Sequence, residues 1–217
     1  MSFDPEALKR AAAVAAAEEV EDGMALGLGT GSTVAHLLPA IAARGVRGLR
    51  CVATSEATER QAAALGIVVE PFDALTRLDL AIDGADQIAP DGWIVKGGGG
   101  AHTREKIVAA AAARFVVIAD VSKVVDALSA PVPVELLEFG LAATLAAVAP
   151  CVVRLGAPPS PDGGVIADYA GDVADPAALA ARLSATPGVV DHGLFPPALT
   201  SAVIVAGPDG VVRRALA

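Results

Sequence analysis

Residues 24–34 read MALGLGTGSTV, and this stretch decides the fold. Residues 24–28 form a short apolar run that is typical of a buried strand, and residues 34–43 favour a helix. A glycine-rich turn between a strand and a helix indicates a β–α unit, and ligands bind at such turns in open α/β sheets. The turn does not match the dinucleotide fingerprint, because Ser32 replaces its third glycine, and it is not a P-loop, because no lysine follows. It is therefore either a phosphate cradle of hydroxyl and N–H groups or a tight turn with a Ser or Thr cap.

Apolar strands and amphipathic helices alternate on both sides of this turn. A helix is expected over residues 8–20, with Asp4 as its cap and Pro5 in its first turn. The alternation predicts an α/β fold class, with a Rossmann-like, mostly parallel sheet and helices on both faces. The expected strands include residues 49–53, 67–69, 78–82, 93–95 and 115–119, and the expected helices include residues 55–65 and 103–114.

After about residue 125 the order changes to strand, helix, two strands, helix and strand. This order is typical of a small α+β lobe with an antiparallel, ferredoxin-like sheet. Residues 201–206 read as a final buried strand that returns to the first domain. We therefore expect a Rossmann-like domain of residues 1–128 and 201–217, and a small lobe of residues 129–200.

The composition excludes several classes of protein. Of the 217 residues, 54% are hydrophobic and 19% are charged, so the chain is not disordered. A net charge of −9 argues against a nucleic-acid binder. No apolar run reaches the ~20 residues of a membrane span, and the acidic start is not typical of a signal peptide, so we expect a cytoplasmic protein with no membrane attachment. Cys51 and Cys151 lie in apolar stretches, where we expect reduced core thiols.

Two carboxylates follow the expected strand 78–82, in the sequence Asp83-Gly84-Ala85-Asp86. Strand ends are where α/β proteins bind ligands, so these carboxylates suit an acid, a base or a metal ligand. The alternative is ordinary turn chemistry, in which Asp and Gly are common. Metal binding is the weakest of these interpretations, because no histidine or further carboxylate accompanies the pair.

A run of four glycines follows Lys96, and the segment continues to Lys106 as KGGGGAHTREK. Four glycines cost backbone entropy, so a folded domain needs a reason to carry them. Their exposed N–H groups beside Lys96 suit an oxyanion. Glu105 lies in the first turn of the next helix, where the helix dipole also favours a carboxylate without any catalytic role.

The remaining candidates are weaker. His36 and His192 have no partner motif and are expected to be surface or boundary residues. His102 lies in the glycine segment, where a catalytic role is conceivable but better candidates exist. Trp93 is expected to pack the strand before Lys96. Only four of the 16 basic residues are lysines, at positions 9, 96, 106 and 123.

In this order and spacing, the motifs resemble those of the ribose-5-phosphate isomerase family, type A. They are the turn 27–33, Thr54-Ser55, Asp83 to Asp86, Lys96 to Gly99 and Thr103 to Lys106, and the resemblance covers nearly the whole chain. It implies a cofactor-free and metal-free isomerase that interconverts D-ribose 5-phosphate and D-ribulose 5-phosphate in the pentose phosphate pathway. It also implies a homodimer or homotetramer.

The resemblance also implies the roles of particular residues. Glu105 is the expected general base, and Asp83, Asp86 and Lys96 are expected at the reacting end of the sugar. Lys9 and Lys123 are expected at the phosphate, together with the turn. The remaining substrate-binding residues implied are Thr30, Gly31, Ser32, Thr33, Gly84, Ala85, Gly97, Gly98 and Gly99.

Two features depart from the family pattern. His102 stands where an apolar residue is common. Residues 155–168 are proline-rich and lack the usual Asp-Asn-Gly-Asn-like turn, which we expect to affect oligomer contacts more than chemistry.

Two other functions stay open at this point. A non-catalytic sugar-phosphate-binding effector domain would keep the phosphate turn without the base, although no DNA-binding helix-turn-helix precedes Asp4 and the chain is acidic. A CoA transferase or an amino-sugar-phosphate deaminase would also use a glycine turn and a glutamate. The motifs at Asp83 and Lys96 fit the isomerase better.

Overall fold

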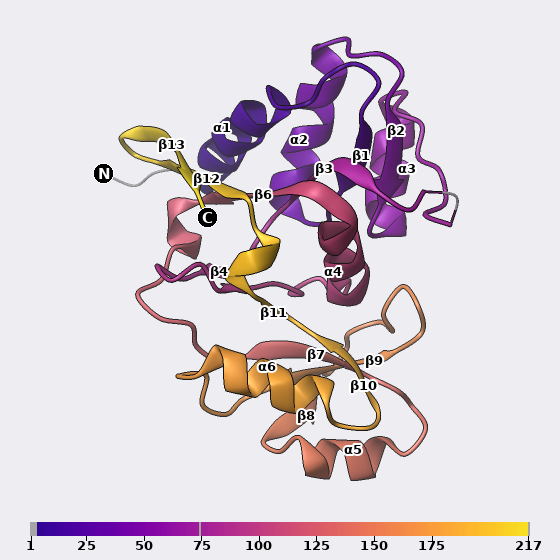
Figure 1. The fold of residues 1–217 in the computed structure, drawn as a ribbon, viewed down its shortest axis with the longest axis vertical. Helices are drawn as coiled ribbons and strands as arrows, with labels where there is room; N and C mark the ends of the chain where they lie inside the picture. The colour runs from indigo at the N-terminus through magenta and orange to yellow at the C-terminus, as the bar shows by residue number, and fades with distance from the viewer. Residues whose placement is uncertain (1–3, 74, 217) are drawn as a thin grey trace. The chain divides into compact units, whose positions relative to one another are not determined.

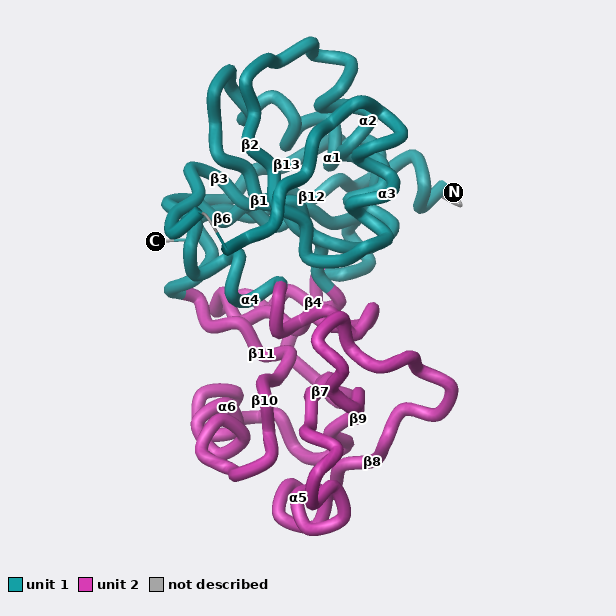
Figure 2. Tube along the Cα trace, turned by 90° about the vertical axis from the view of Figure 1, so that its right-hand side faces the viewer, with its two compact units in different colours: residues 1–85, 105–123, 198–217 teal, residues 86–104, 124–197 magenta. Residues whose placement is uncertain are grey.

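The chain divides into two compact units, each assembled from segments that are distant in sequence (Figure 2). The computed structural model describes residues 4–73 and 75–216. The first unit comprises residues 1–85, 105–123 and 198–217, and the second comprises residues 86–104 and 124–197. The domain boundaries expected at residues 128 and 200 remain a prediction. The compact units differ from the expected domains chiefly because segment 86–104 belongs to the second unit. Residues 1–3, which begin the segment expected not to be a signal peptide, lie outside the described residues.

A six-stranded sheet forms the centre of the first unit, in the order β13-β12-β6-β3-β1-β2 (Figure 1). Neighbouring strands are parallel, except that β12 and β13 form an antiparallel pair. The strands are β1 (Ala25–Leu28), β2 (Arg50–Ala53), β3 (Leu78–Asp83), β6 (Ala112–Asp120), β12 (Ala202–Gly207) and β13 (Gly210–Ala215). The predicted mostly parallel α/β sheet is therefore confirmed.

Local capping starts the helices of this unit where the sequence predicts. Asp4 Oδ1 accepts a hydrogen bond from Glu6 N at 3.0 Å, and Ser55 Oγ accepts one from Thr58 N at 3.2 Å. The helices are α1 (Pro5–Ala17), α2 (Ser32–Ala43), α3 (Glu56–Ala64) and α4 (His102–Ala111), which enters this unit at Glu105. A short 3₁₀ turn, η1 (Val121–Lys123), follows β6.

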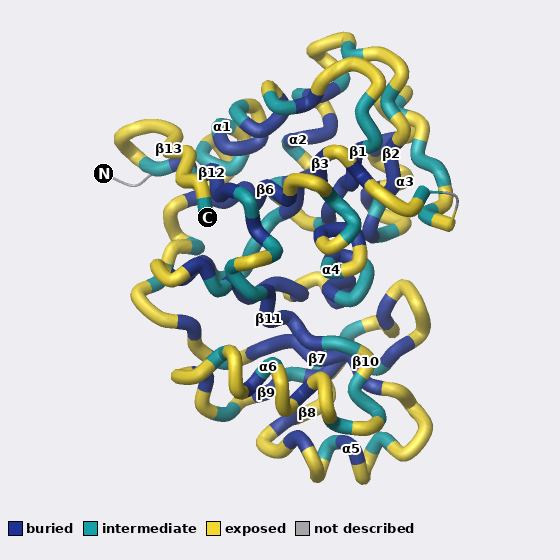
Figure 3. The backbone as a smooth tube through the Cα atoms, viewed as in Figure 1, coloured by how far each residue is buried: buried dark blue, intermediate teal, exposed yellow. Residues whose placement is uncertain are grey.

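Small side chains let the helices approach the sheet closely. Ala12, Ala13 and Ala16 of α1 are fully buried in the core of the first unit. A Cβ at Gly27 in β1 would lie 2.4 Å from Val108 Cγ1 of α4, so glycine is required there for this close packing. Figure 3 shows the contrast between the buried strands of the sheet and β13, whose residues are all exposed.

The second unit contains an antiparallel sheet in the order β10-β7-β9-β8. Its elements follow one another as β7 (Val132–Leu136), α5 (Leu141–Ala147), β8 (Cys151–Val153), β9 (Val165–Tyr169), α6 (Pro176–Ser184) and β10 (Val189–His192). A three-stranded sheet is formed by β4 (Gln87–Ile88), β5 (Ile94–Val95) and β11 (Leu194–Phe195), and η2 (Pro197–Leu199) follows. This order and antiparallel pairing confirm the predicted α+β, ferredoxin-like lobe.

Three details differ from the predicted elements. The strand expected over residues 67–69 is reduced to one bridge between Val69 and Cys51. The helix expected to reach Arg114 ends at Ala111, because Ala112 and Arg114 pair with β3 and this pairing overrides the helix propensity of alanine. The hairpin strand β13 was not predicted, because its exposed residues (GVVRRA) lack the alternation of apolar and polar side chains that marks a half-buried strand.

Both cysteines are free and buried, which confirms the expected core thiols. Burial raises the pKa of Cys51 to about 11 and that of Cys151 to about 11. Among the described residues, none of the helices combines the length and the hydrophobicity that crossing a membrane requires.

Candidate functional site

In the first unit, the glycine-rich turn after β1 meets Asp83 at the end of β3. Asp83 is 2% exposed, and its Oδ1 accepts hydrogen bonds from Thr30 N at 3.0 Å and Gly84 N at 2.7 Å. β1 and β3 are parallel neighbours, so their carboxyl ends meet at one edge of the sheet. A Cβ at Gly29 would lie 2.0 Å from Asp83 Cγ, so Gly29 is the residue that admits this carboxylate. The structure thereby brings together the glycine-rich turn at residues 27–33 and the motif that begins at Asp83.

Hydroxyl groups from two segments surround Thr30. Thr30 Oγ1 lies 2.7 Å from Thr54 Oγ1 and 2.9 Å from Ser55 Oγ. Thr58 Oγ1 donates to the Gly29 carbonyl at 2.8 Å. This hydrogen bond ties the glycine-rich turn to the first turn of α3. The predicted Thr54-Ser55 motif therefore does more than cap α3, because it fixes the side chain of Thr30.

The helix α2 begins directly after this turn. Gly31 is its N-cap with φ +119°, a conformation that favours glycine, and glycine has no side chain to cap the helix. Gly31 and Ser32 are exposed, and Thr33 is half-buried. An exposed helix N-terminus without a side-chain cap suits an anion, so both the N–H groups and the hydroxyls fit a phosphate.

The two lysines expected at the phosphate lie in the first unit, one in α1 and one in η1. Lys9 Nζ contacts Glu6 Oε1 at 2.7 Å, and His36 Nε2 of α2 contacts Glu6 Oε2 at 2.9 Å. The hydrogen bond from Lys9 lowers the pKa of Glu6, and the one from His36 adds to this effect. Lys123 follows β6, whose carboxyl end lies at the same edge of the parallel sheet as Asp83. The pairing of Lys9 with Glu6 was not predicted, although their i, i+3 spacing on one helix is a usable signal.

In the second unit, Asp86 supports the glycine segment that follows β5. Gly98 N donates to Asp86 Oδ2 at 2.8 Å, and a Cβ at Gly98 would lie 2.8 Å from Asp86 Oδ1. Gly100 N donates to the carbonyl of Gly97 at 2.9 Å and closes a turn. Gly97 has φ +97°, and a Cβ there would lie 2.7 Å from His102 Nδ1. The glycines are therefore needed for close approach and for backbone conformation, and they do not form a loose linker.

His102 is fully buried beneath Gly97. This position favours a packing role for His102 under the glycine turn over a catalytic one. His192 is also buried, and its Nδ1 accepts from Leu194 N at 3.2 Å, so the expected surface or boundary position is wrong for His192. His192 ends β10, and its hydrogen bond to Leu194 N orients the chain toward β11. The burial of His192 depends on the pairing of β10 with β7, so the residues next to it in sequence do not indicate it.

Lys96 is 2% exposed, although lysine is almost never fully buried in proteins. Its Nζ lies 5.4 Å from the centroid of the Phe195 ring, which provides a cation–π contact. Its backbone N donates to the Gly193 carbonyl at 2.9 Å, so β5 and the chain before β11 hold the residue in place. A buried lysine is costly and is retained where its charge is used.

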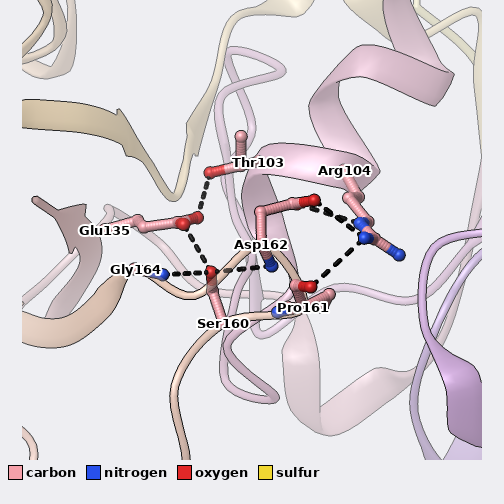
Figure 4. A network of polar contacts seen from close by, with 7 residues as sticks. All are labelled: Thr103, Arg104, Glu135, Ser160, Pro161, Asp162 and Gly164. Carbon is pink, nitrogen blue, oxygen red and sulfur yellow. Dashed lines mark hydrogen bonds and ion pairs between the residues drawn. The ribbon is translucent and has the colours of Figure 1, made fainter.

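Glu105 lies in the first turn of α4 and is 4% exposed. The residues before it are anchored in the second unit by a polar network (Figure 4). Thr103 Oγ1 donates to Glu135 Oε2 at 2.5 Å, and Ser160 Oγ donates to Glu135 Oε1 at 2.5 Å. Ser160 Oγ in turn accepts from Gly164 N at 2.9 Å. Glu135 is 1% exposed, and no motif in the sequence assigned it a role.

Arg104 completes this network from the same helix turn. Its guanidinium forms a fork with Asp162, at 2.9 Å from Nε and 2.7 Å from Nη2, and Nη2 donates to the Pro161 carbonyl at 3.2 Å (Figure 4). Ser160 N also donates to Gly164 O at 2.8 Å, so residues 160–164 form a closed turn. In place of the Asp-Asn-Gly-Asn-like turn that segment 155–168 lacks, a Ser-Pro-Asp-Gly-Gly turn stands there and contacts Arg104 of α4. The expected effect of this segment on oligomer contacts stays a prediction.

The predicted site residues are thus distributed over both units. Those of the first unit are Lys9, Thr30, Gly31, Ser32, Thr33, Asp83, Gly84, Ala85, Glu105 and Lys123. Those of the second unit are Asp86, Lys96, Gly97, Gly98 and Gly99. Within the first unit Asp83 is brought to Thr30 and Gly84, and within the second Asp86 is brought to Gly98.

Comparison with known proteins gives one consistent result. The family profile of ribose 5-phosphate isomerase A (phosphoriboisomerase A) matches residues 50–210. The chain is 46% identical to ribose-5-phosphate isomerase A of Nitrobacter hamburgensis, over 95% of this chain and 96% of that protein. It is similar in structure to ribose 5-phosphate isomerase A of Neisseria gonorrhoeae, with a TM-score of 0.94, 31% identity and 100% of both chains covered. It is also similar to a D-ribose-5-phosphate isomerase solved with phospho-erythronic acid, with a TM-score of 0.92, 30% identity, and 98% of this chain and 100% of that chain covered.

Proposed function

Because the chain belongs to the ribose 5-phosphate isomerase A family, we propose that it interconverts D-ribose 5-phosphate and D-ribulose 5-phosphate in the non-oxidative pentose phosphate pathway. The observation that carries this proposal is the carboxylate of Asp83, buried beside the exposed N-terminus of α2 at one edge of the sheet. A carboxylate beside an anion-binding turn suits a phosphorylated sugar. The family relatives give no support to the non-catalytic effector domain.

Glu105 is the proposed general base. The reaction moves one proton from C2 of the aldose to C1 of the ketose, and a second proton from O2 to O1. Glu105 takes the carbon-bound proton, which leaves an enediolate, and returns it to the neighbouring carbon. A positioned base of this kind contributes roughly 10²–10⁴-fold to the rate.

Asp83 is proposed to move the second proton between the sugar oxygens and to assist opening of the furanose ring. The N–H groups of Thr30 and Gly84 fix one of its oxygens, which supports a defined orientation toward substrate. Asp86 is proposed to hold the glycine turn and to orient a sugar hydroxyl, since its Oδ2 accepts from Gly98 N. Gly84 and Ala85, between these carboxylates, are proposed to contact the sugar through their backbone.

Lys96 and the N–H groups of Gly97 and Gly99 are proposed to stabilise the enediolate, while the N–H of Gly98 holds Asp86 beside them. The negative charge of this intermediate develops on oxygen, and preorganised donors act most strongly where water is excluded. The burial of Lys96 supports this role, because its charge is poorly screened there. One such donor contributes about 3 kcal/mol to transition-state stabilisation.

The phosphate of the substrate is proposed to bind at Thr30, Gly31, Ser32 and Thr33, with Lys9 and Lys123 as counter-charges. The net charge of −9 repels an anion at long range, so attraction has to be local. The phosphorylated sugar acid bound in one structural relative is an anion of the same kind. Phosphate binding orients the sugar over Glu105, because binding energy remote from the reacting carbons can be used for positioning.

The proposed assembly is a homodimer or homotetramer acting in the cytoplasm. Light scattering coupled to size-exclusion chromatography measures the assembly directly, and a monomer at the concentration of the assay contradicts it. Fractionation of the source cells tests the location.

Glu105→Gln tests the proposed base. We expect it to fold normally, to bind ribose 5-phosphate and to lose at least about 100-fold in kcat, since amide cannot accept the proton. Glu59→Gln is the matched control, because Glu59 is an exposed carboxylate in the first turn of α3. Formation of ketose from ribose 5-phosphate is the assay, and near-normal turnover by Glu105→Gln removes the proposed base.

A further inference from the structure

Arg154 lies in the second unit, immediately after β8, and none of the sequence motifs pointed to it. It forms a fork with Asp168 of the neighbouring strand β9, at 2.8 Å from Nε to Oδ2 and 2.6 Å from Nη2 to Oδ1. The pairing of β8 with β9 places the two residues together, and Arg154 N also donates to Ile166 O at 2.9 Å. Both side chains are largely buried, at 24% and 19% exposure. The guanidinium is therefore rigidly held.

The remaining nitrogen of Arg154 reaches the glycine turn after Lys96. Arg154 Nη1 donates to the Gly98 carbonyl at 2.8 Å and to the Gly97 carbonyl at 3.4 Å. The hydrogen bond with Asp168 raises the pKa of Arg154, and the charge of Asp86 adds to this effect, so the guanidinium stays charged. The charged guanidinium of Arg154 thus lies on the carbonyl side of the Gly97–Gly98 and Gly98–Gly99 peptides.

The orientation of these carbonyls determines where the N–H groups point. In a trans peptide the C=O and N–H bonds are nearly antiparallel. The peptide that joins Gly97 to Gly98 shows this directly, because its carbonyl faces Arg154 while its N–H donates to Asp86 Oδ2. By the same geometry, the hydrogen bond to the Gly98 carbonyl turns the N–H of Gly99 away from Arg154 and toward the Asp86 side. Glycine peptides rotate easily. Gly100 N and Asp86 also hold the Gly97–Gly98 peptide, so the bond from Arg154 matters most for the orientation of the Gly98–Gly99 peptide.

We propose that Arg154, held by Asp168, is a positioning residue that aims the N–H group of Gly99 at the reacting end of the substrate, while the N–H of Gly98 stays on Asp86. This inference rests on the proposed isomerase function. The guanidinium also polarises the Gly98–Gly99 peptide, because a hydrogen bond to a carbonyl strengthens the N–H of the same peptide as a donor. The effect is largest when charge develops on the sugar oxygen, so Arg154 acts on the transition state more than on bound substrate.

The test compares two arginines that each form a two-bond ion pair with a carboxylate, Arg154 with Asp168 and Arg50 with Glu70. Arg154→Lys keeps the charge but cannot bind Asp168 and the glycine carbonyls together. Arg50→Lys is the matched control, since Arg50 forms a fork with Glu70 at 2.7 and 2.9 Å on the exposed side of the first unit. We expect Arg154→Lys to lose about 10–100-fold in kcat, as supporting residues of a site typically do, with KM nearly unchanged. Arg50→Lys keeps wild-type values of both constants.

Two further measurements separate positioning from simple loss of structure. Asp168→Asn leaves Arg154 in place but weakens its anchor, so a smaller decrease in kcat is expected with the same KM. Guanidinium ion added to Arg154→Ala restores part of kcat, which a folding defect does not allow. The inference is overturned if Arg154→Lys and Asp168→Asn keep kcat, or if they raise KM alone. Absence of ketose formation by the wild-type enzyme instead overturns the proposed function.

Discussion

The Oδ1 atom of Asp83 accepts the backbone N–H of Thr30 at 3.0 Å, and this bond joins the end of β3 to the turn that begins α2. The proposed proton-transfer group and the proposed phosphate cradle thereby share one hydrogen bond. A shift of either segment is transmitted to the other, so substitutions in the turn are expected to affect catalysis as well as binding.

Gly29→Ala tests this coupling. Its Cβ would lie 2.0 Å from Asp83 Cγ, so the carboxylate has to move. We expect a loss of kcat together with a rise in KM, and a decrease of about 1–3 kcal/mol in the free energy of unfolding from overpacking. Steady-state kinetics and urea denaturation measure the three quantities.

Gly207→Ala serves as the control for that substitution. A Cβ at Gly207 would meet Val121 Cβ at 3.6 Å, which is ordinary van der Waals contact. It should leave kcat, KM and stability close to wild type. Wild-type kinetics for Gly29→Ala would show that the position of Asp83 does not depend on this turn.

The cysteines give a prediction about pH and reactivity. Burial raises the pKa of Cys51 to about 11 and that of Cys151 to about 11, so both are neutral thiols in the folded protein at about pH 8. Because the pKa of each thiol is higher in the folded protein than the ordinary value of 9.0, burying the neutral thiol costs nothing extra below pH 9.0. Its contribution to the free energy of unfolding is lost as the pH rises from 9.0 toward 11. Iodoacetamide is expected to modify neither thiol in the native enzyme and both in urea, as measured by intact mass. Rapid labelling without denaturant would contradict the burial.

Glu6 is expected to make stability fall at acid pH. Lys9 and His36 lower its pKa below 4.5, so its favourable contacts are complete above that pH and are lost as the pH falls through the lowered value. The difference in unfolding free energy between wild type and Glu6→Gln should therefore shrink on acidification. A difference that grows at low pH would mean that Glu6 is not the partner of these cations in solution.

Turnover is expected to survive a metal chelator. Within the described part of the chain, no three His, Cys, Asp or Glu side chains come together as ligands for a metal ion. The proposed enediolate chemistry uses Lys96 and peptide N–H groups as its electrophiles. Activity is compared before and after dialysis against EDTA, and a loss that a divalent ion restores means that the carboxylates are misassigned.

Local signals explain why much of the fold could be predicted from the sequence. Asp4, Ser55 and Asp175 each cap the helix that follows them, and each acts within three residues of its own position. The motifs around Asp83 and Lys96 were equally visible, because strand ends and glycine turns are local patterns. Assignment of their roles came from the resemblance to a family and remains a proposal.

Long-range contacts explain what the sequence did not reveal. In β7, Val132, Val134 and Leu136 alternate with Pro133 and Glu135, a pattern that is typical of a strand with one solvent-facing side. Glu135 is nevertheless 1% exposed because the turn at residues 160–164 covers it, and a sequence separation of 25 from Ser160 leaves no local pattern. The position of Arg154 could not be predicted either, because its contacts to Gly97 and Gly98 join residues more than 50 positions apart in sequence.

Glu135→Gln tests whether the network of Figure 4 stabilises the start of α4. Both oxygens of Glu135 accept hydroxyl protons, from Thr103 and from Ser160, and an amide offers only one acceptor. The second hydroxyl then meets an N–H group, so the free energy of unfolding is expected to fall by about 1–3 kcal/mol.

Glu138→Gln is the control for this change, because Glu138 is exposed in the same unit and should alter stability by less than about 0.5 kcal/mol. Urea denaturation measures both variants, and hydrogen exchange at Arg104 and Glu105 reports on the helix turn itself. Faster exchange there in Glu135→Gln, without a change in the core of the first unit, is the expected local signature. Equal stability and equal exchange in the two variants would show that Thr103 and Ser160 do not need the carboxylate, and that other contacts hold the proposed base.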